Sequence, residues 1–245
     1  MDGGSSDDTC EKVDKIKSGI EQNSDYIYIK NQKFYLPNKT NSIKCKGISF
    51  RFFSEKDEGQ SDAINKGLKL GIGDIFCWLN SDDLYYNNQV FKKVINEFNK
   101  KDIHFLYGRA GRVDRQKNWI REEIHAKKFK PVYIDKVDFI VQPSTFWSKD
   151  LLNNIGYLDK NYKYVFDWDY WVRISKSYKL SFINEILSLN RVYDETKTMS
   201  GGQERDFEII DLLLKYNSLN DFSKRMNNIS EEKLNLYIKG RNADV

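Results

Sequence analysis

Two pairs of acidic residues stand where carboxylates could take part in chemistry. Asp82 and Asp83 directly follow the apolar run from Ile75 to Leu79, and adjacent carboxylates at a strand end suit a hard cation such as Mg²⁺ or Mn²⁺. Such ions are typically held by one or two carboxylates together with substrate phosphates and water. The two residues equally fit the N-cap and first turn of a helix near Asn88. The spacing alone favours neither interpretation.

The second pair, Asp167 and Asp169, lies among aromatic residues in the segment Phe166 to Trp171. Partial burial there would raise the pKa of a carboxyl group toward the range useful to a general base. Residues two apart on a helix point in different directions, so at most one of the two acids is expected to face a cleft. The other would cap the helix or pair with Arg173. Two acids at a helix start are the common structural alternative.

The segments around the first pair predict an α/β fold. The run from Ile75 to Leu79 is apolar at every position, which is typical of a strand covered on both faces of a parallel sheet. Apolar residues then recur at helical spacing from Phe91 to Phe98, before a short strand from His104 to Tyr107. Ligands of open parallel sheets bind outside the carboxyl ends of the strands, and this is where Asp82 and Asp83 are expected.

Further elements are predicted along the rest of the chain. We expect helices from near Thr9 through Ile20, Ser61 to Leu70, Asp150 to Ile155, Phe166 to Arg173, Glu204 to Tyr216 and Glu231 to Ile238, and strands at Ile48 to Phe53 and Leu180 to Leu189. Residues 26–45 fit a hairpin or an inserted loop that helps to select an acceptor or simply lies on the surface; the surface loop is favoured.

Composition excludes several classes of protein. The chain has 245 residues, and its 40 Lys and Arg against 36 Asp and Glu are dispersed, which argues against a nucleic-acid partner and only weakly indicates an anionic membrane surface. No apolar run is long enough to span a membrane, and no export signal is recognised at the start. The 3 Cys and 2 His lack zinc-type spacing, so a cytoplasmic location is expected.

Taken in order, these motifs resemble glycosyltransferase family 2, whose members use nucleotide sugars and have the GT-A fold. Asp2 to Thr9 resembles the family's DGSxDxT turn, Ser54 to Gly67 its SExDxGxxDAxNKG stretch, Asn80 to Asp83 its DxD-type metal motif, Gln142 to Ser144 its QPS, and Phe166 to Trp171 its ED-type segment. The resemblance runs from residue 1 to about Thr198.

The resemblance implies a GT-A-like (Rossmann-like), mostly parallel sheet flanked by helices in residues 1–200, with a C-terminal helical appendage in residues 201–245. The family's domain begins upstream of the DGSxDxT turn with a Val- and Ile-rich strand. No such strand precedes Asp2 in this sequence, so we expect the domain to be incomplete at its N-terminus.

Residue roles follow from the same resemblance. On the donor side, Asp2 would bond uracil, Gln60 and Asp62 would line the nucleotide, Asp83 would bind the metal, and Asp82 would lie by the ribose or the metal's water shell. Asp167 would be the general base, Gln142, Ser144 and Trp168 would lie on the acceptor side, and Lys197 would contact phosphate. Tyr193 stands where relatives often carry His.

The implied reaction is an inverting, Mg²⁺- or Mn²⁺-dependent transfer from a nucleotide sugar, with a UDP-linked donor favoured, to a glycan or lipid-linked acceptor in surface polysaccharide biosynthesis. A lipid-linked acceptor would bring the protein to the inner membrane face as a peripheral contact. Two alternatives stay open: a catalytically silent domain that lacks the first strand, and another metal-dependent nucleotide enzyme such as a nucleotidyltransferase.

Overall fold

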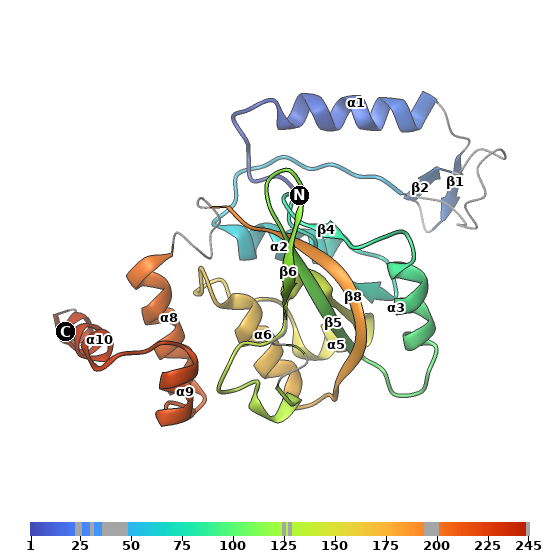
Figure 1. Cartoon of the computed structure of the whole chain (residues 1–245). Helices are drawn as coiled ribbons and strands as arrows, with labels where there is room; N and C mark the ends of the chain where they lie inside the picture. The colour runs from blue at the N-terminus through green and yellow to red at the C-terminus, as the bar shows by residue number, and fades with distance from the viewer. Residues whose placement is uncertain are drawn as a thin grey trace. The chain divides into compact units, whose positions relative to one another are not determined.

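A computed structural model describes residues 1–22, 26–29, 32–35, 49–123, 126, 129–193 and 201–243. The chain divides into two compact units, Met1–Gly67 and Leu68–Val245 (Figure 1). The boundary expected near residue 200 does not coincide with this division. The C-terminal helices belong to the same unit as the six-stranded sheet.

The first unit contains helix α1 (Thr9–Gln22), the antiparallel hairpin of β1 (Tyr26–Ile29) and β2 (Gln32–Tyr35), and the start of α2 (Gln60–Leu70). Both helices were expected from the sequence, and a hairpin was one of the two interpretations of residues 26–45. The remainder of the predicted insertion, residues 36–45, lies outside the described part of the chain.

The strand predicted at Ile48 to Phe53 is wrong for the described residues 49–53, which form no ladder. A single parallel bridge joins Asp2 and Ser54, in which the Asp2 N–H donates to the Phe53 carbonyl at 2.9 Å. The pairing stops there because Gly4, with a φ of 85°, turns the chain away, and a glycine adopts that conformation without strain.

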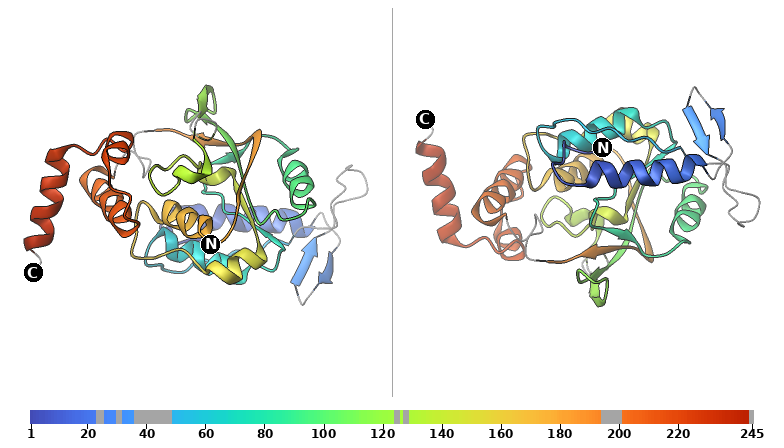
Figure 2. Two further views of the ribbon diagram at one scale, coloured as in Figure 1. Left: turned by 90° about the horizontal axis from the view of Figure 1, so that it is seen from below. Right: turned by 90° about the horizontal axis from the view of Figure 1, so that it is seen from above.

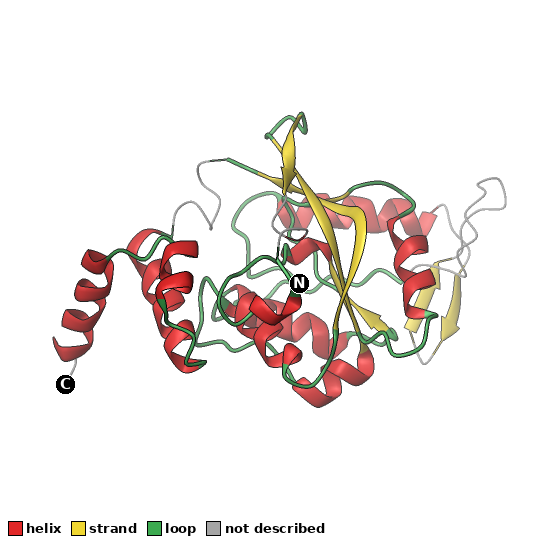
Figure 3. Ribbon diagram, turned by 60° about the horizontal axis from the view of Figure 1, so that its bottom comes forward, coloured by secondary structure: helices red, strands yellow, loops and turns green. Residues whose placement is uncertain are grey.

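The second unit is built on a six-stranded sheet with the order β3-β7-β5-β8-β4, in which β6 also pairs with β5 (Figure 3). Its strands are β3 (Ile75–Phe76), β4 (Leu84–Tyr85), β5 (Phe105–Val113), β6 (Trp119–Glu123), β7 (Thr145–Ser148) and β8 (Leu180–Arg191). The α/β class is therefore confirmed.

The sheet is mixed rather than mostly parallel. Among the pairings within this unit only β5 with β8 is parallel, and the others are antiparallel. Parallel neighbours need a long crossover connection, which the segment between β5 and β8 supplies, whereas β6 follows β5 after a short turn.

The apolar run from Ile75 to Leu79 forms a strand only at its first two residues. In this unit β3 pairs with β7 alone, and Leu79 is 38% exposed, so the predicted burial on both faces is wrong. The Trp78 carbonyl accepts a hydrogen bond from the side chain of Gln142 at 2.8 Å rather than from a neighbouring strand, which ends the ladder.

Helices cover the sheet according to the alternation of its side chains. Leu106 and Phe146 pack with Val90 and Val94 of α3 (Val90–Phe98). Their neighbours Phe105 and Trp147 contact Trp171 of α6 (Phe166–Ser175), with ring centroids 5.1 and 6.0 Å apart. Successive strand residues point to opposite faces, so one pair of strands anchors both helices.

The remaining helices are short or C-terminal. They are the 3-10 turns η1 (Pro131–Tyr133) and η2 (Gln142–Ser144), and the α-helices α5 (Lys149–Ile155), α8 (Gly202–Lys215), α9 (Asp221–Met226) and α10 (Glu231–Ala243). Helices α8 to α10 gather on one side of the sheet (Figure 2), and α9 was not predicted. Among the described residues, no helix combines the length and apolar character needed to cross a bilayer.

Candidate active site

The carboxylate of Asp2 joins two of the predicted motifs within the first unit. Its Oδ2 accepts hydrogen bonds from the N–H groups of Gly4 and Ser5 and from the Ser54 hydroxyl, at 3.1, 3.0 and 2.6 Å. The hydroxyls of Ser5 and Ser54 are the main reason that the pKa of Asp2 lies well below its usual value. The carboxylate is therefore ionised and holds the turn, and its contact with uracil stays a prediction.

A second link between the same motifs involves Gly3. A Cβ at this position would collide with the Asp57 carboxylate, whose other oxygen accepts a hydrogen bond from the Gly59 N–H at 2.9 Å. The backbone of Gly4 also lies against Lys56. The segments that begin at Asp2 and at Ser54 are thus packed against each other within the first unit.

Gln60 and Asp62 lie at the start of α2, directly after the segment that begins at Ser54. Asp62 accepts a hydrogen bond from the Glu58 N–H at 3.2 Å and lies 3.4 Å from the ammonium group of Lys66. Lys66 in turn pairs with Glu55 at 3.1 Å. The nucleotide-side roles of Gln60 and Asp62 remain predictions.

In the second unit, Asn80 to Asp83 form a tight turn, closed by a bond from the Asp83 N–H to the Asn80 carbonyl at 3.1 Å. The Asn80 side chain donates to Asp83 Oδ2 and to Gln142 Oε1, both at 3.2 Å. Gln142 is buried and its amide nitrogen bonds Trp78, so both of its polar atoms support this turn. Gln142 therefore supports the acid turn, and its contact with the acceptor stays a prediction.

No helix begins at these acids. Strand β4 follows them directly, and α3 begins only at Val90, with Gln89 as its N-cap. The interpretation of Asp82 and Asp83 as helix-capping residues is therefore wrong.

The pairing of β4 with β8 brings other residues to the acid turn. Leu84 lies opposite Leu189 in antiparallel register, so the end of β8 runs beside the two acids. The backbone N–H of Arg191 donates to Asp83, and the Tyr193 hydroxyl donates to Asp82 Oδ2 at 2.9 Å. The guanidinium of Arg115 lies 4.8 Å from the centre of the Tyr193 ring.

Burial, followed by the neighbouring charge of Asp82, raises the pKa of Asp83 to about 6. Two hard oxygen donors that repel each other are the set that Mg²⁺ or Mn²⁺ would stabilise. Among the described residues, no group of three or more His, Cys, Asp or Glu could hold a metal. The pair fits a cation whose remaining ligands come from substrate phosphates and water.

Arg191 is a site residue that the sequence analysis missed. Its Nε is buried and has no hydrogen-bond partner among the described residues. A buried guanidinium donor beside a candidate metal turn suits an anion such as a phosphate. The available signal was its position at the carboxyl end of a predicted strand.

Of the second acidic pair, Asp169 is fully buried and structural. Burial alone would raise its pKa, but hydrogen bonds from Lys215, Tyr216 and Arg173 lower it. The Arg173 bond, at 2.8 Å, confirms that one acid of the pair binds this arginine. Asp167 is half-buried in the first turn of α6, where the Trp168 N–H donates to its Oδ1 at 2.8 Å.

Asp138 is a second residue that the sequence analysis missed. Its Oδ1 is buried and, within the residues that the structure describes, has no hydrogen-bond partner. Burial raises its pKa well above the usual value, the charge of Asp167 raises it further, and Arg205 opposes both effects. The folded chain thus brings Asp138 and Asp167 close together, although a single Asp between Val137 and Phe139 gave no signal in the sequence.

Two predicted acceptor-side residues are part of the core. Ser144 is fully buried, donates to the Arg109 carbonyl at 2.8 Å and shares a bond with the Ser188 hydroxyl. Trp168 is 1% exposed and its indole N–H bonds the Ile134 carbonyl at 2.6 Å. Neither side chain is exposed enough to contact a sugar. More of the aromatic residues of α6 are buried in the core than the helical spacing indicated. Lys197 lies outside the described residues.

Comparison with known proteins gives one family. The sequence profile of "Glycosyl transferase family 2" matches residues 1–156. An uncharacterized glycosyltransferase of Rickettsia typhi is 24% identical over 82% of this chain, and one of Rickettsia conorii is 26% identical over 61%. The chain spans 65% and 26% of the length of these relatives.

Solved structures are similar in fold. Staphylococcus aureus TarS (residues 1–349) in complex with UDP-GlcNAc has a TM-score of 0.58 at 15% identity, over 90% of this chain and 57% of that chain. The mannosyltransferase PcManGT of Pyrobaculum calidifontis, in complex with GDP-Man and Mn²⁺, has a TM-score of 0.57 at 11% identity, over 99% and 69%. These likenesses confirm the GT-A-type fold.

Proposed function

The chain belongs to glycosyltransferase family 2, and from this membership we propose that it transfers a sugar from a nucleotide-sugar donor to a hydroxyl group of an acceptor. The observation that carries the proposal is the turn at Asp82 and Asp83 together with the buried Nε of Arg191 beside it, which has no hydrogen-bond partner in the described part of the chain. Carboxylates for a cation and a cationic donor for phosphate are what a nucleoside diphosphate group requires.

On the donor side, Asp82 and Asp83 would hold Mg²⁺ or Mn²⁺, which when bound stabilises the charge that develops on the leaving diphosphate. Arg191 would donate to a phosphate oxygen, and Tyr193 fixes one carboxylate oxygen of Asp82. The Mn²⁺ and GDP-Man of the similar mannosyltransferase support this assignment. Asp2, Gln60 and Asp62 would line the base and ribose, with UDP favoured as the nucleotide.

On the acceptor side, Asp167 would accept the proton of the attacking hydroxyl as the sugar is displaced with inversion. Its half-buried place in the first turn of α6 suits a base that must stay reachable while water is limited. Burial, followed by the charge of Asp167, raises the pKa of Asp138, so Asp138 holds a proton more readily than an ordinary Asp does.

The acceptor would be a glycan or a lipid-linked sugar in surface polysaccharide biosynthesis. A lipid-linked acceptor would bring the protein to the inner membrane face. The side chains of Trp119 and Ile120 on β6 support such a contact, because each is 51% exposed. Transfer would then take place in the cytoplasm.

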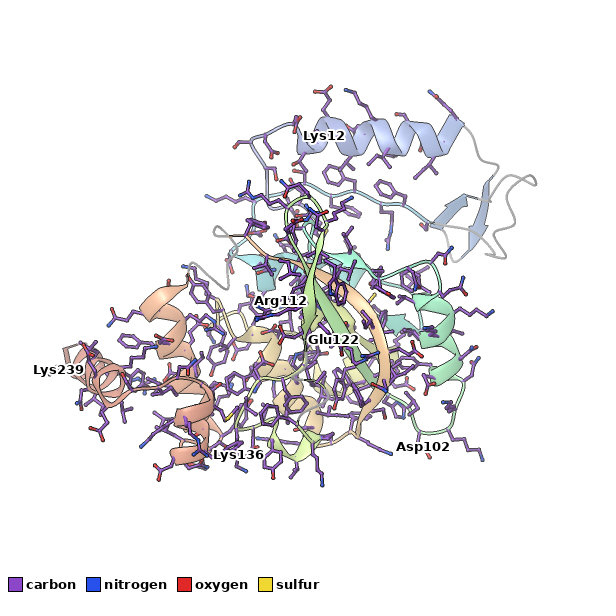
Figure 4. All side chains as sticks on the ribbon, in the orientation of Figure 1. Lys12, Asp102, Arg112, Glu122, Lys136 and Lys239 are labelled. Carbon is purple, nitrogen blue, oxygen red and sulfur yellow. The ribbon has the colours of Figure 1, made fainter. Side chains whose placement is uncertain are left out.

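Calorimetric titration of UDP with and without Mn²⁺ tests the donor site. Wild type should bind UDP only with the metal, and Asp83→Asn should weaken that binding at least about tenfold, because a direct ligand is lost. Asp102→Asn is the matched control: Asp102 lies on the exposed loop after α3 (Figure 4), with a φ of 65° that Asn tolerates. Metal-independent binding, or equal losses in both variants, would contradict the assignment.

A further inference from the structure

Helix α8 contacts the chain around Asp167 at two points, one before this residue and one after it. The structure leads us to propose that Glu208 of α8 is a positioning residue for the general base, because it fixes the backbone that leads into α6. This inference rests on the proposed function, since it assigns Glu208 a part in the same transfer.

The first contact is a carboxylate bound to backbone. Glu208 Oε1 accepts a hydrogen bond from the Lys163 N–H at 2.8 Å, and Oε2 accepts from Tyr164 and Val165 at 2.7 and 3.1 Å. Val165 is the N-cap of α6, and its own side chain makes no capping bond. The Val165 N–H is one of the groups that a helix start leaves without an intrahelical partner, and the Lys163 and Tyr164 N–H groups belong to the backbone just before the helix. Glu208 therefore fixes the chain where it enters α6.

The second contact lies two residues after Asp167. Lys215 and Tyr216, at the end of α8, donate to Asp169 Oδ1 at 2.8 and 2.7 Å, and Arg173 donates to Oδ2. Asp169 is fully buried, so its carboxylate is held on all sides. Asp167 therefore stands between two points, residues 163–165 and Asp169, that α8 fixes.

Helix α8 is itself firmly seated, because Ile209, Ile210, Leu212 and Leu213 are all buried. Both oxygens of Glu208 accept hydrogen bonds, which leaves the side chain little freedom to turn. Misplacement of a reacting group by about 1 Å can cost on the order of a hundredfold in rate. A rigid entry to α6 is therefore directly useful to a base in its first turn.

Glu204 provides a matched control on the same helix. It lies one turn before Glu208 and contacts side chains of the same segment: Lys163 Nζ at 2.9 Å and the Tyr164 hydroxyl at 3.1 Å. Glu204→Gln removes the same charge as Glu208→Gln and leaves the bonds from Glu208 to the backbone N–H groups in place.

The test compares Glu208→Gln, Glu204→Gln and wild type in the full chain with Mn²⁺, with UDP-GlcNAc and GDP-mannose as probe donors and release of the nucleoside diphosphate as the readout. Water is the acceptor in this assay: it takes the sugar, its proton passes to the base, and the nucleoside diphosphate leaves. Glu208→Gln should lower kcat by about ten- to a hundredfold, with donor affinity unchanged by calorimetry. Amides 163–165 should exchange hydrogen faster in this variant alone. Glu204→Gln should stay within about twofold of wild type, as expected for an exposed pair.

The double variant with Asp167→Asn separates positioning from general destabilisation. If Glu208 acts through Asp167, adding Glu208→Gln to Asp167→Asn should cause no further loss of the residual rate. An equal further loss, or a wild-type kcat despite unprotected amides, would overturn the inference. Absence of any turnover and of UDP binding in wild type would instead overturn the proposed function, and the exchange of amides 163–165 would still report whether Glu208 fixes the backbone at the entry to α6.

Discussion

The hydroxyl of Tyr193 lies 2.9 Å from Oδ2 of Asp82, although the two residues are 111 positions apart in the sequence. The antiparallel pairing of β4 with β8 makes this contact possible, because it runs the end of β8 alongside the acid turn. Tyr193 thus bonds one carboxylate oxygen of Asp82 and thereby orients the other oxygen.

Tyr193→Phe should weaken Mn²⁺-dependent UDP binding by about ten- to a hundredfold, since a hydrogen bond to a charged group is typically worth about 1.5 to 3 kcal/mol. Calorimetric titration of UDP measures the change. Tyr86→Phe is the control, because Tyr86 is 44% exposed. An unchanged affinity in Tyr193→Phe would mean that the bond to Asp82 has no bearing on the donor site.

Binding of Mn²⁺ should depend on the protonation of Asp83, whose pKa is raised to about 6. A cation binds the ionised carboxylate, so affinity should be full above this pKa and fall about tenfold per pH unit below it. Titration of Mn²⁺ between about pH 5 and 7.5, followed by electron paramagnetic resonance, measures the slope. Asp83→Asn should bind weakly at every pH; a wild-type affinity that is flat across this range would contradict the prediction.

Asp138→Asn should stabilise the protein at neutral and alkaline pH. The pKa of Asp138 is raised in the folded chain, so the folded state binds the proton more tightly than the unfolded chain, whose Asp pKa is about 3.9. Wild-type stability is therefore lost as pH rises above that value, and an amide cannot ionise. Melting temperatures should show the variant a few degrees higher at pH 8 and near wild type at pH 4; a gain equal at both pH values would point to packing instead.

Gly3→Ala should disturb the packing between the segments that begin at Asp2 and at Ser54. The added Cβ would displace the Asp57 carboxylate from its bond with Gly59, at a cost of about 1 to 2 kcal/mol, and UDP binding should weaken with it. Gly19→Ala is the contrasting variant: nothing lies within 4 Å of its Cβ, so it should stabilise α1 slightly. Limited proteolysis and UDP titration compare the two; equal behaviour would contradict the steric argument.

The sequence predicted those features that depend on neighbouring residues along the chain. The periodicity of α3, α6 and α8 and the abrupt polar turn after Leu79 are local patterns, and the structure contains all of them. The role of Trp168 was not predictable in this way, because its indole N–H is hydrogen-bonded to the Ile134 carbonyl, 34 positions away. Arg191, Asp138 and Glu208 likewise gain their importance only from strands and helices that meet in space.

The strand β5 limits how the sequence of this protein can change in length. It pairs with β6, β7 and β8 at once, and its alternating side chains anchor α3 on one face and α6 on the other. Inserting or deleting a single residue within it would exchange the two faces and break register with three partners. Length variation among homologous sequences should therefore be confined to turns such as residues 114–118, while β5 itself is inherited without gaps.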